Sequence, residues 1–173
     1  MVPRLRSLHV CGLRSLRDVT LALHPETTVL AGANGAGKSN VLGAVRLVSH
    51  LATQGLRAHV AKAGGASRVL HYGPQVTREL ELELVFEQER GTNHYAARLA
   101  WAAGDQLVFV DERVGHDSST GIRWTELGVG HLESRVPDAA TSGDITARSV
   151  QYCLRRLTYY HFHDTAPEAP LRT

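Results

Sequence analysis

Eight consecutive residues combine glycines, a lysine and a serine at a spacing that suits phosphate binding. The segment Gly32-Ala33-Asn34-Gly35-Ala36-Gly37-Lys38-Ser39 meets every fixed position of the pattern G-x-x-x-x-G-K-[ST]. Its glycines lack a Cβ, so the backbone can turn successive N–H groups toward phosphate oxygens. The lysine brings a positive charge to the terminal phosphates, and the serine hydroxyl can ligate Mg²⁺. The segment therefore predicts a site for a nucleoside triphosphate, with ATP and Mg²⁺ as the expected ligands.

We expect the nucleotide to contact Asn34, Gly35, Ala36, Gly37, Lys38 and Ser39, and we assign Ser39 to the metal. Asn40 follows directly and is also a candidate contact. For this residue two roles stay open in equal measure, a helix-start residue and a ligand of a nucleotide phosphate.

The elements that must position this loop can be read on both sides of it. Residues Thr27 to Ala31 form a short β-branched and apolar run, which predicts a buried strand. After the loop, apolar residues recur at three- and four-residue steps, as in an amphipathic helix: Val41, Leu42, Val45, Val48 and Leu51. Gly55 is expected to end this helix as a left-handed cap. The free amides and positive dipole end of such a helix favour phosphate.

The rest of the chain predicts an antiparallel sheet and one more helix. Alternating or β-branched runs indicate strands at residues 4–10, 18–23, 78–87, 95–101 and 106–114, the last three forming a meander. A polar, glycine-rich stretch covers 115–130. A helix is expected at about 145–157, capped by Asp144, and a strand at 158–162. These elements give an α/β fold.

Composition limits the classes that need to be considered. The 173 residues suit one domain, and a formal charge of +2 is far below that of most dedicated nucleic-acid binders. Cys11 and Cys153 match no metal or redox spacing. The sequence contains no apolar run as long as a membrane span, so we expect no membrane association and a cytoplasmic protein.

Three segments carry a family resemblance: Leu8 to Leu16, Gly32 to Asn40, and the block Tyr160-His161-Phe162-His163-Asp164-Thr165. Together they resemble the N-terminal part of the RecF-like and SMC-like AAA ATPases, whose nucleotide domains are built like ABC transporter heads. The third block resembles a bacterial branch of that group. The resemblance implies a P-loop NTPase of ABC-head type. It also implies that Arg14, which follows the first strand, contacts the nucleotide.

The same resemblance implies that some of the hydrolytic machinery lies elsewhere. Family members carry the ABC signature and the acidic strand with its catalytic Glu in a C-terminal lobe. We therefore expect residues 1–173 to be a single P-loop nucleotide-binding domain without that lobe. Hydrolysis would then require a complementary lobe or partner, and ATP would join two heads into a homo- or heterodimer. DNA is a possible further partner, with Arg57, Lys62 and Arg68 as candidate phosphate contacts.

Two alternatives remain open at this stage. Four apolar residues precede Asp111 and Glu112, in the manner of an acidic strand that holds Mg²⁺ and orients water, so the chain could be a self-contained small NTPase or kinase. It could also be a nucleotide-binding scaffold or truncated product without turnover. His163 and Asp164 are weak catalytic candidates. Their block could be the γ-phosphate-sensing Q-loop of an ABC-type head, an ordinary structural segment or a separate metal site.

Overall fold

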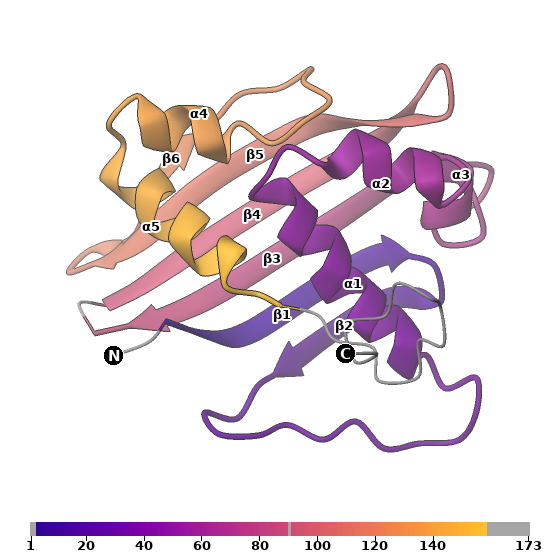
Figure 1. The fold of residues 1–173 in the computed structure, drawn as a ribbon, viewed down its shortest axis with the longest axis horizontal. Coiled ribbons are helices and arrows are strands. Elements are labelled where there is room, and N and C mark those ends of the chain that lie inside the picture. The colour runs from indigo at the N-terminus through magenta and orange to yellow at the C-terminus, as the bar shows by residue number, and fades with distance from the viewer. Residues whose placement is uncertain (1–2, 90, 159–173) are drawn as a thin grey trace, which may run out of the picture.

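Alternating apolar and polar residues produce one antiparallel sheet in the computed structural model, which describes residues 3–89 and 91–158. Its strands are β1 (Arg4–Leu13), β2 (Leu16–Ala22), β3 (Glu79–Gln88), β4 (Gly91–Ala102), β5 (Gln106–Ser118) and β6 (Gly121–Glu126). They lie in the order β2-β1-β3-β4-β5-β6 (Figure 1). The expected α/β class and meander are confirmed.

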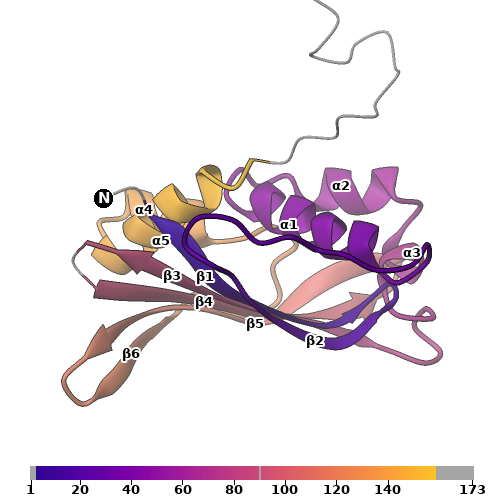
Figure 2. The same ribbon diagram turned by 90° about the horizontal axis from the view of Figure 1, so that it is seen from below.

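Five helices accompany the sheet in the described residues: α1 (Lys38–Leu51), α2 (Leu56–Lys62), α3 (Ala66–Val69), α4 (Val136–Thr141) and α5 (Ile145–Arg155). Figure 2 shows them over one face of the sheet. Asp144 caps α5 as expected, because its Oδ1 accepts a hydrogen bond of 2.7 Å from Ala147 N. No helix within 3–89 and 91–158 has the length and apolar character needed to cross a membrane.

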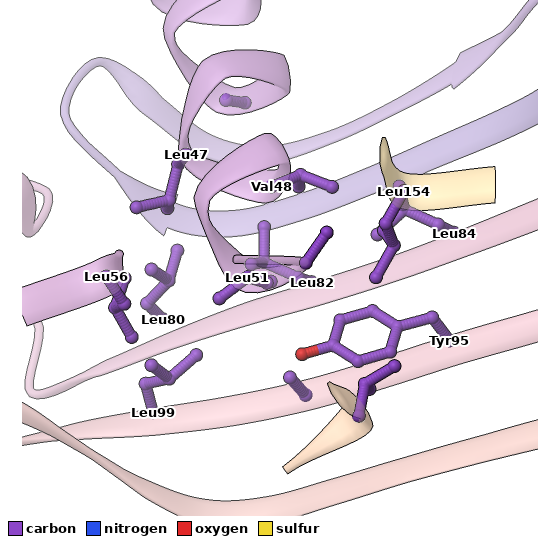
Figure 3. Close-up of a cluster of buried hydrophobic side chains, with 14 of the residues drawn as sticks. Leu47, Val48, Leu51, Leu56, Leu80, Leu82, Leu84, Tyr95, Leu99 and Leu154 are labelled. Atoms are coloured by element: carbon purple, nitrogen blue, oxygen red, sulfur yellow. The ribbon is translucent and has the colours of Figure 1, made fainter. Parts of the chain in front are cut away.

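The core forms between the helices and the leucine face of the sheet. Leu80, Leu82 and Leu84 of β3 are buried, whereas the glutamates between them point to the opposite face. Leu47 and Leu51 of α1 pack into the same cluster (Figure 3). Each such buried side chain stabilises the fold by about 1.5–3 kcal/mol, so this layer fixes α1 on the sheet.

The predicted strand at Thr27 to Ala31 is wrong. The segment has no regular structure and is exposed throughout, and Val29 keeps 79% of its surface accessible. Figure 1 shows the connection from β2 to α1 running outside the sheet. A strand needs a neighbour for its N–H and C=O groups, and no described strand pairs with this segment.

Two helix details also differ from the predictions. Gln54, with φ of 53°, takes the left-handed conformation that was expected of Gly55, which instead has φ of −106° and begins α2. The buried stripe of α1 uses Ala44 and Leu47 beside Val48 and Leu51, and leaves Leu42 42% exposed. The helix is therefore rotated about its axis relative to the predicted stripe.

The polar, glycine-rich stretch 115–130, for which no strand was predicted, contains regular structure. β5 continues to Ser118 and forms a hairpin with β6, in which the Ser118 hydroxyl donates 2.6 Å to the Gly121 carbonyl. Ile122 and Trp124 supply β-branched and aromatic side chains to this strand. The predicted strand at 158–162 and the Tyr160–Thr165 block lie outside the described residues, apart from Thr158, which is not in a strand.

Candidate functional site

Backbone conformation shapes the phosphate loop at the start of α1. Gly35 and Gly37 have φ of 83° and 90°, values that residues with a Cβ rarely adopt. Gly37 is the N-cap of α1, no side chain caps the helix, and its first turn holds no acidic residue. The first N–H groups of a helix have no intrahelical acceptor. The helix therefore presents free donors and a positive dipole end to an anion.

Lys38 folds its ammonium back over this loop. Its Nζ donates to the carbonyl oxygens of Gly32 at 2.7 Å and Ala33 at 2.8 Å. These contacts hold the ammonium against the first two residues of the loop. Ser39 is exposed beside it, so its hydroxyl is free to reach a metal ion or water. Asn34, Gly35 and Ala36 are also exposed in the loop.

The turn between β1 and β2 packs against the start of α1. Asn40 Nδ2 donates to Ser15 Oγ at 2.6 Å, and a Cβ built on Gly37 would lie 3.2 Å from the same oxygen. Asn40 thus ties the turn to the loop, a role distinct from the two considered from the sequence. Ser15 was missed, although it stands directly after Arg14 in the segment that carried the family resemblance.

Arg14 is brought to the same region by this turn. It has φ of 47°, its N–H donates 2.9 Å to the Val69 carbonyl, and its guanidinium lies against Gly43 of α1, 3.9 Å from a Cβ built there. The side chain is exposed. The structure therefore places Arg14 beside the first turns of α1, within the neighbourhood of the loop.

The Arg14 charge is one of several that act on His59 of α2. Burial lowers the pKa of His59 on α2 to about 4, and the charges of His50, Arg46, Arg14 and Lys62 lower it further in that order of size. The His50 and His59 rings are 4.6 Å apart. Lowered pKa values favour the neutral forms of both histidines, so the charges here are those of Arg14, Arg46 and Lys62, with the Glu133 carboxylate near His50.

Glu112 is not brought to the phosphate loop. It is 0% exposed, and its Oε1 accepts hydrogen bonds from Tyr95 Oη at 2.9 Å and Ser134 Oγ at 2.6 Å. Its Oε2 accepts from Arg135 N at 2.8 Å. Burial raises the pKa of this carboxyl above its ordinary value, and the three hydrogen bonds oppose that rise. His131 Nε2 also lies 3.7 Å from Oε2, and together these contacts hold the segment before α4 to the sheet.

Sheet order separates Glu112 from the loop as well. β3 and β4 lie between β1 and β5, which puts β5 roughly 14 Å from β1 across the sheet at the usual strand spacing. Asp111, one residue earlier, lies 3.9 Å from Arg113 Nε on the opposite face. The two acidic residues thus do not converge on one site. Their antiparallel strand also lacks the parallel pairing that the self-contained alternative would need.

The remaining predicted candidates, His163 and Asp164, lie outside the described residues. Within 3–89 and 91–158, no group of three or more His, Cys, Asp or Glu side chains could hold a metal ion. The assignment of Mg²⁺ to Ser39 stays a prediction; its side chain is exposed at the loop.

Sequence comparisons agree with a nucleotide-site interpretation. Residues 27–128, more than half of the chain, match the family described as "AAA domain, putative AbiEii toxin, Type IV TA system". The chain is also similar to the DNA replication and repair protein RecF of Pseudomonas entomophila strain L48, with 50% identity over 44 residues, 25% of this chain and 12% of the relative. RecF of Anaeromyxobacter sp. strain K is 48% identical over 48 residues, 28% of this chain and 13% of the relative.

The matched part of the chain thus spans about one eighth of the length of these curated relatives. The family match covers the phosphate loop, all three helices that follow it and the meander. It therefore confirms the P-loop NTPase fold and the RecF-like AAA resemblance. The chain belongs to the AbiEii-like family of AAA domains.

Proposed function

We propose that this chain binds ATP with Mg²⁺ as the N-terminal half of a RecF/SMC-like ATPase. One observation carries the proposal: the uncapped N-terminus of α1, with left-handed glycines before it and the Lys38 ammonium over it, forms a cradle for phosphates. In this assignment Lys38 exchanges its two loop carbonyls for β- and γ-phosphate oxygens. The Ser39 hydroxyl ligates Mg²⁺, which stabilises charge on the phosphates when bound.

We infer that hydrolysis requires a complementary lobe or partner. Glu112 accepts hydrogen bonds from three donors and lies across the sheet from the loop, so it does not stand ready to orient water there. Val29 and Leu30 lie exposed directly before the loop, in a segment whose composition suits a buried strand. A second lobe that pairs with this segment would bury those side chains and bring catalytic groups to the phosphates. A homo- or heterodimer with composite ATP sites is the arrangement we propose.

The binding proposal is tested by calorimetric titration of the protein with ATP in the presence and absence of Mg²⁺. Lys38→Ala should weaken ATP binding by about 10- to 100-fold, the value of one charge-assisted hydrogen bond. Ser39→Ala should reduce the difference between the ATP affinities measured with and without Mg²⁺. Arg155→Ala, which removes an exposed cation from α5, is the matched control and should bind as the wild type does. Unchanged affinity in Lys38→Ala would contradict the proposal.

DNA is a second candidate partner. The RecF relatives are DNA replication and repair proteins, and Arg57, Lys62 and Arg68 are exposed on α2 and α3. These cations would contact phosphates without reading sequence. A triple alanine variant should bind a DNA duplex more weakly and with a smaller dependence on salt concentration. Equal binding by both proteins at every salt concentration would exclude this surface. We also propose that the protein acts in the cytoplasm.

A further inference from the structure

Tyr72 presents an exposed aromatic ring from a backbone that is held at several points. The residue is 80% exposed and has φ of 53°, a left-handed conformation that is unfavourable for a residue with a Cβ. Leu70 bridges to Leu13, His71 N donates 2.9 Å to the Gly12 carbonyl, and Gly73 N donates 3.2 Å to the Leu70 carbonyl. These bonds impose the strained geometry, and the ring gains no burial from it.

Residues 70–73 are connected to the phosphate loop through direct contacts. The His71 Nδ1 atom hydrogen-bonds the Arg14 carbonyl oxygen, and the next residue, Ser15, meets Asn40 and Gly37 at the start of α1. Figure 1 shows α3, which immediately precedes this segment, at the same end of the sheet as the β1–β2 turn. An extended ligand that starts in the loop and passes over the turn would thus run toward Tyr72.

The rings of His71 and Tyr72 form a pair suited to a flat ligand. Their centroids are 4.4 Å apart and their planes are inclined by 65°, an edge-on arrangement. Because His71 is fixed through the Arg14 carbonyl, it braces the Tyr72 ring from one side. The high exposure of Tyr72 leaves ring surface free for a second planar group.

We propose that the His71–Tyr72 pair is the base platform of the nucleotide site. The base stacks on the Tyr72 ring while its phosphates lie in the Gly32–Ser39 loop. This inference rests on the ATP binding proposed above. Stacking on an aromatic ring uses the π-face that every base has, so the platform contributes affinity without selecting adenine over guanine.

The test separates the base from the phosphates by using two ligands in calorimetric titrations, Mg·ATP and Mg·tripolyphosphate. Tyr72→Ala and Tyr72→Gly both remove the ring, and the glycine variant also tolerates the left-handed φ. Each should weaken ATP binding about tenfold and leave tripolyphosphate binding unchanged. Tyr72→Phe should match the wild type. Tyr152→Ala, a half-exposed tyrosine on α5, is the control.

Several outcomes would overturn the platform while leaving the phosphate site standing. One is wild-type ATP affinity in both ring-deleted variants, which is also the result expected if Tyr72 serves only to contact another protein. Another is an equal loss of affinity for ATP and tripolyphosphate in these variants, which would mean that the ring supports the loop and does not bind the base. A third is a wild-type protein that binds tripolyphosphate as tightly as ATP. If the wild type binds neither ligand, the proposed function itself fails.

Discussion

The buried carboxylate of Glu112 gives a prediction whose size follows from its contacts. Replacing Glu112 by Ala leaves three buried donors without acceptors, the Tyr95 hydroxyl, the Ser134 hydroxyl and the Arg135 N–H. Each unsatisfied buried donor costs about 1–3 kcal/mol. Removing a carboxyl whose burial is itself unfavourable, as its raised pKa indicates, offsets part of that sum. We expect Glu112→Ala to lower the free energy of unfolding by about 3–5 kcal/mol.

Glu112→Gln separates the structural role from a catalytic one. The Gln carbonyl oxygen can accept from Tyr95 and Ser134, but the amide NH₂ then faces the Arg135 N–H, so one hydrogen bond becomes a contact between two donors. The expected loss is about 1–3 kcal/mol in the free energy of unfolding. This variant stays informative if the alanine variant fails to fold.

The assay is urea unfolding followed by the fluorescence of Trp101 and Trp124. Glu83→Ala and Glu83→Gln are the matched controls, because Glu83 is exposed on the opposite face of β3. Surface changes of this kind usually alter stability by no more than about 0.5 kcal/mol. If Glu112→Ala is as stable as Glu83→Ala, the buried hydrogen bonds of Glu112 do not stabilise the fold as inferred.

Three further predictions concern other parts of the fold. Ser15→Ala and Asn40→Ala should each weaken ATP binding by about 3- to 10-fold. Because both changes remove the same hydrogen bond, the double variant should bind ATP no more weakly than the weaker of the two single variants. Fully additive losses of ATP affinity would argue against that bond. The pKa of His59 is lowered from 6.5 to about 4 in the fold, so between these values the unfolded chain binds a proton that the folded chain does not. The contribution of His59 to stability is therefore complete above pH 6.5 and is lost as pH falls toward 4. The free energy of unfolding should depend less steeply on pH in His59→Gln over this range, and an identical slope would be inconsistent with the lowered pKa. Burial raises the pKa of Cys153 to about 11, so iodoacetamide at pH 8 should modify Cys153 only after unfolding, as read by mass spectrometry; rapid labelling of the folded protein would count against its burial.

Local patterns predicted much of this fold because the deciding interactions are local. Leu80, Leu82 and Leu84 alternate with glutamates, and this period of two fixes both the strand and its buried face. The glycines at 35 and 37 adopt the left-handed conformations that the motif requires. Asp144 caps α5 through a bond only three residues away.

The predictions that were wrong concern residues whose structure depends on a segment distant in the sequence. Val29 and Leu30 have strand-forming side chains, but a strand exists only where another strand pairs with it. Glu112 follows an apolar run typical of a catalytic strand, yet the sheet order and Ser134, 22 residues further on, determine its role. Ser15 and Asn40 are 25 residues apart, and no spacing rule joins them.

We propose that this chain holds ATP but does not complete the hydrolytic site. The most direct measurement is single-turnover hydrolysis of Mg·ATP, with protein in excess and at a concentration at which calorimetry shows the nucleotide to be bound. We predict that bound ATP stays intact over many minutes and that Lys38→Ala weakens the binding by about 10- to 100-fold. Rapid turnover by this chain alone, eliminated in Glu112→Gln under conditions where that variant remains folded, would contradict the claim.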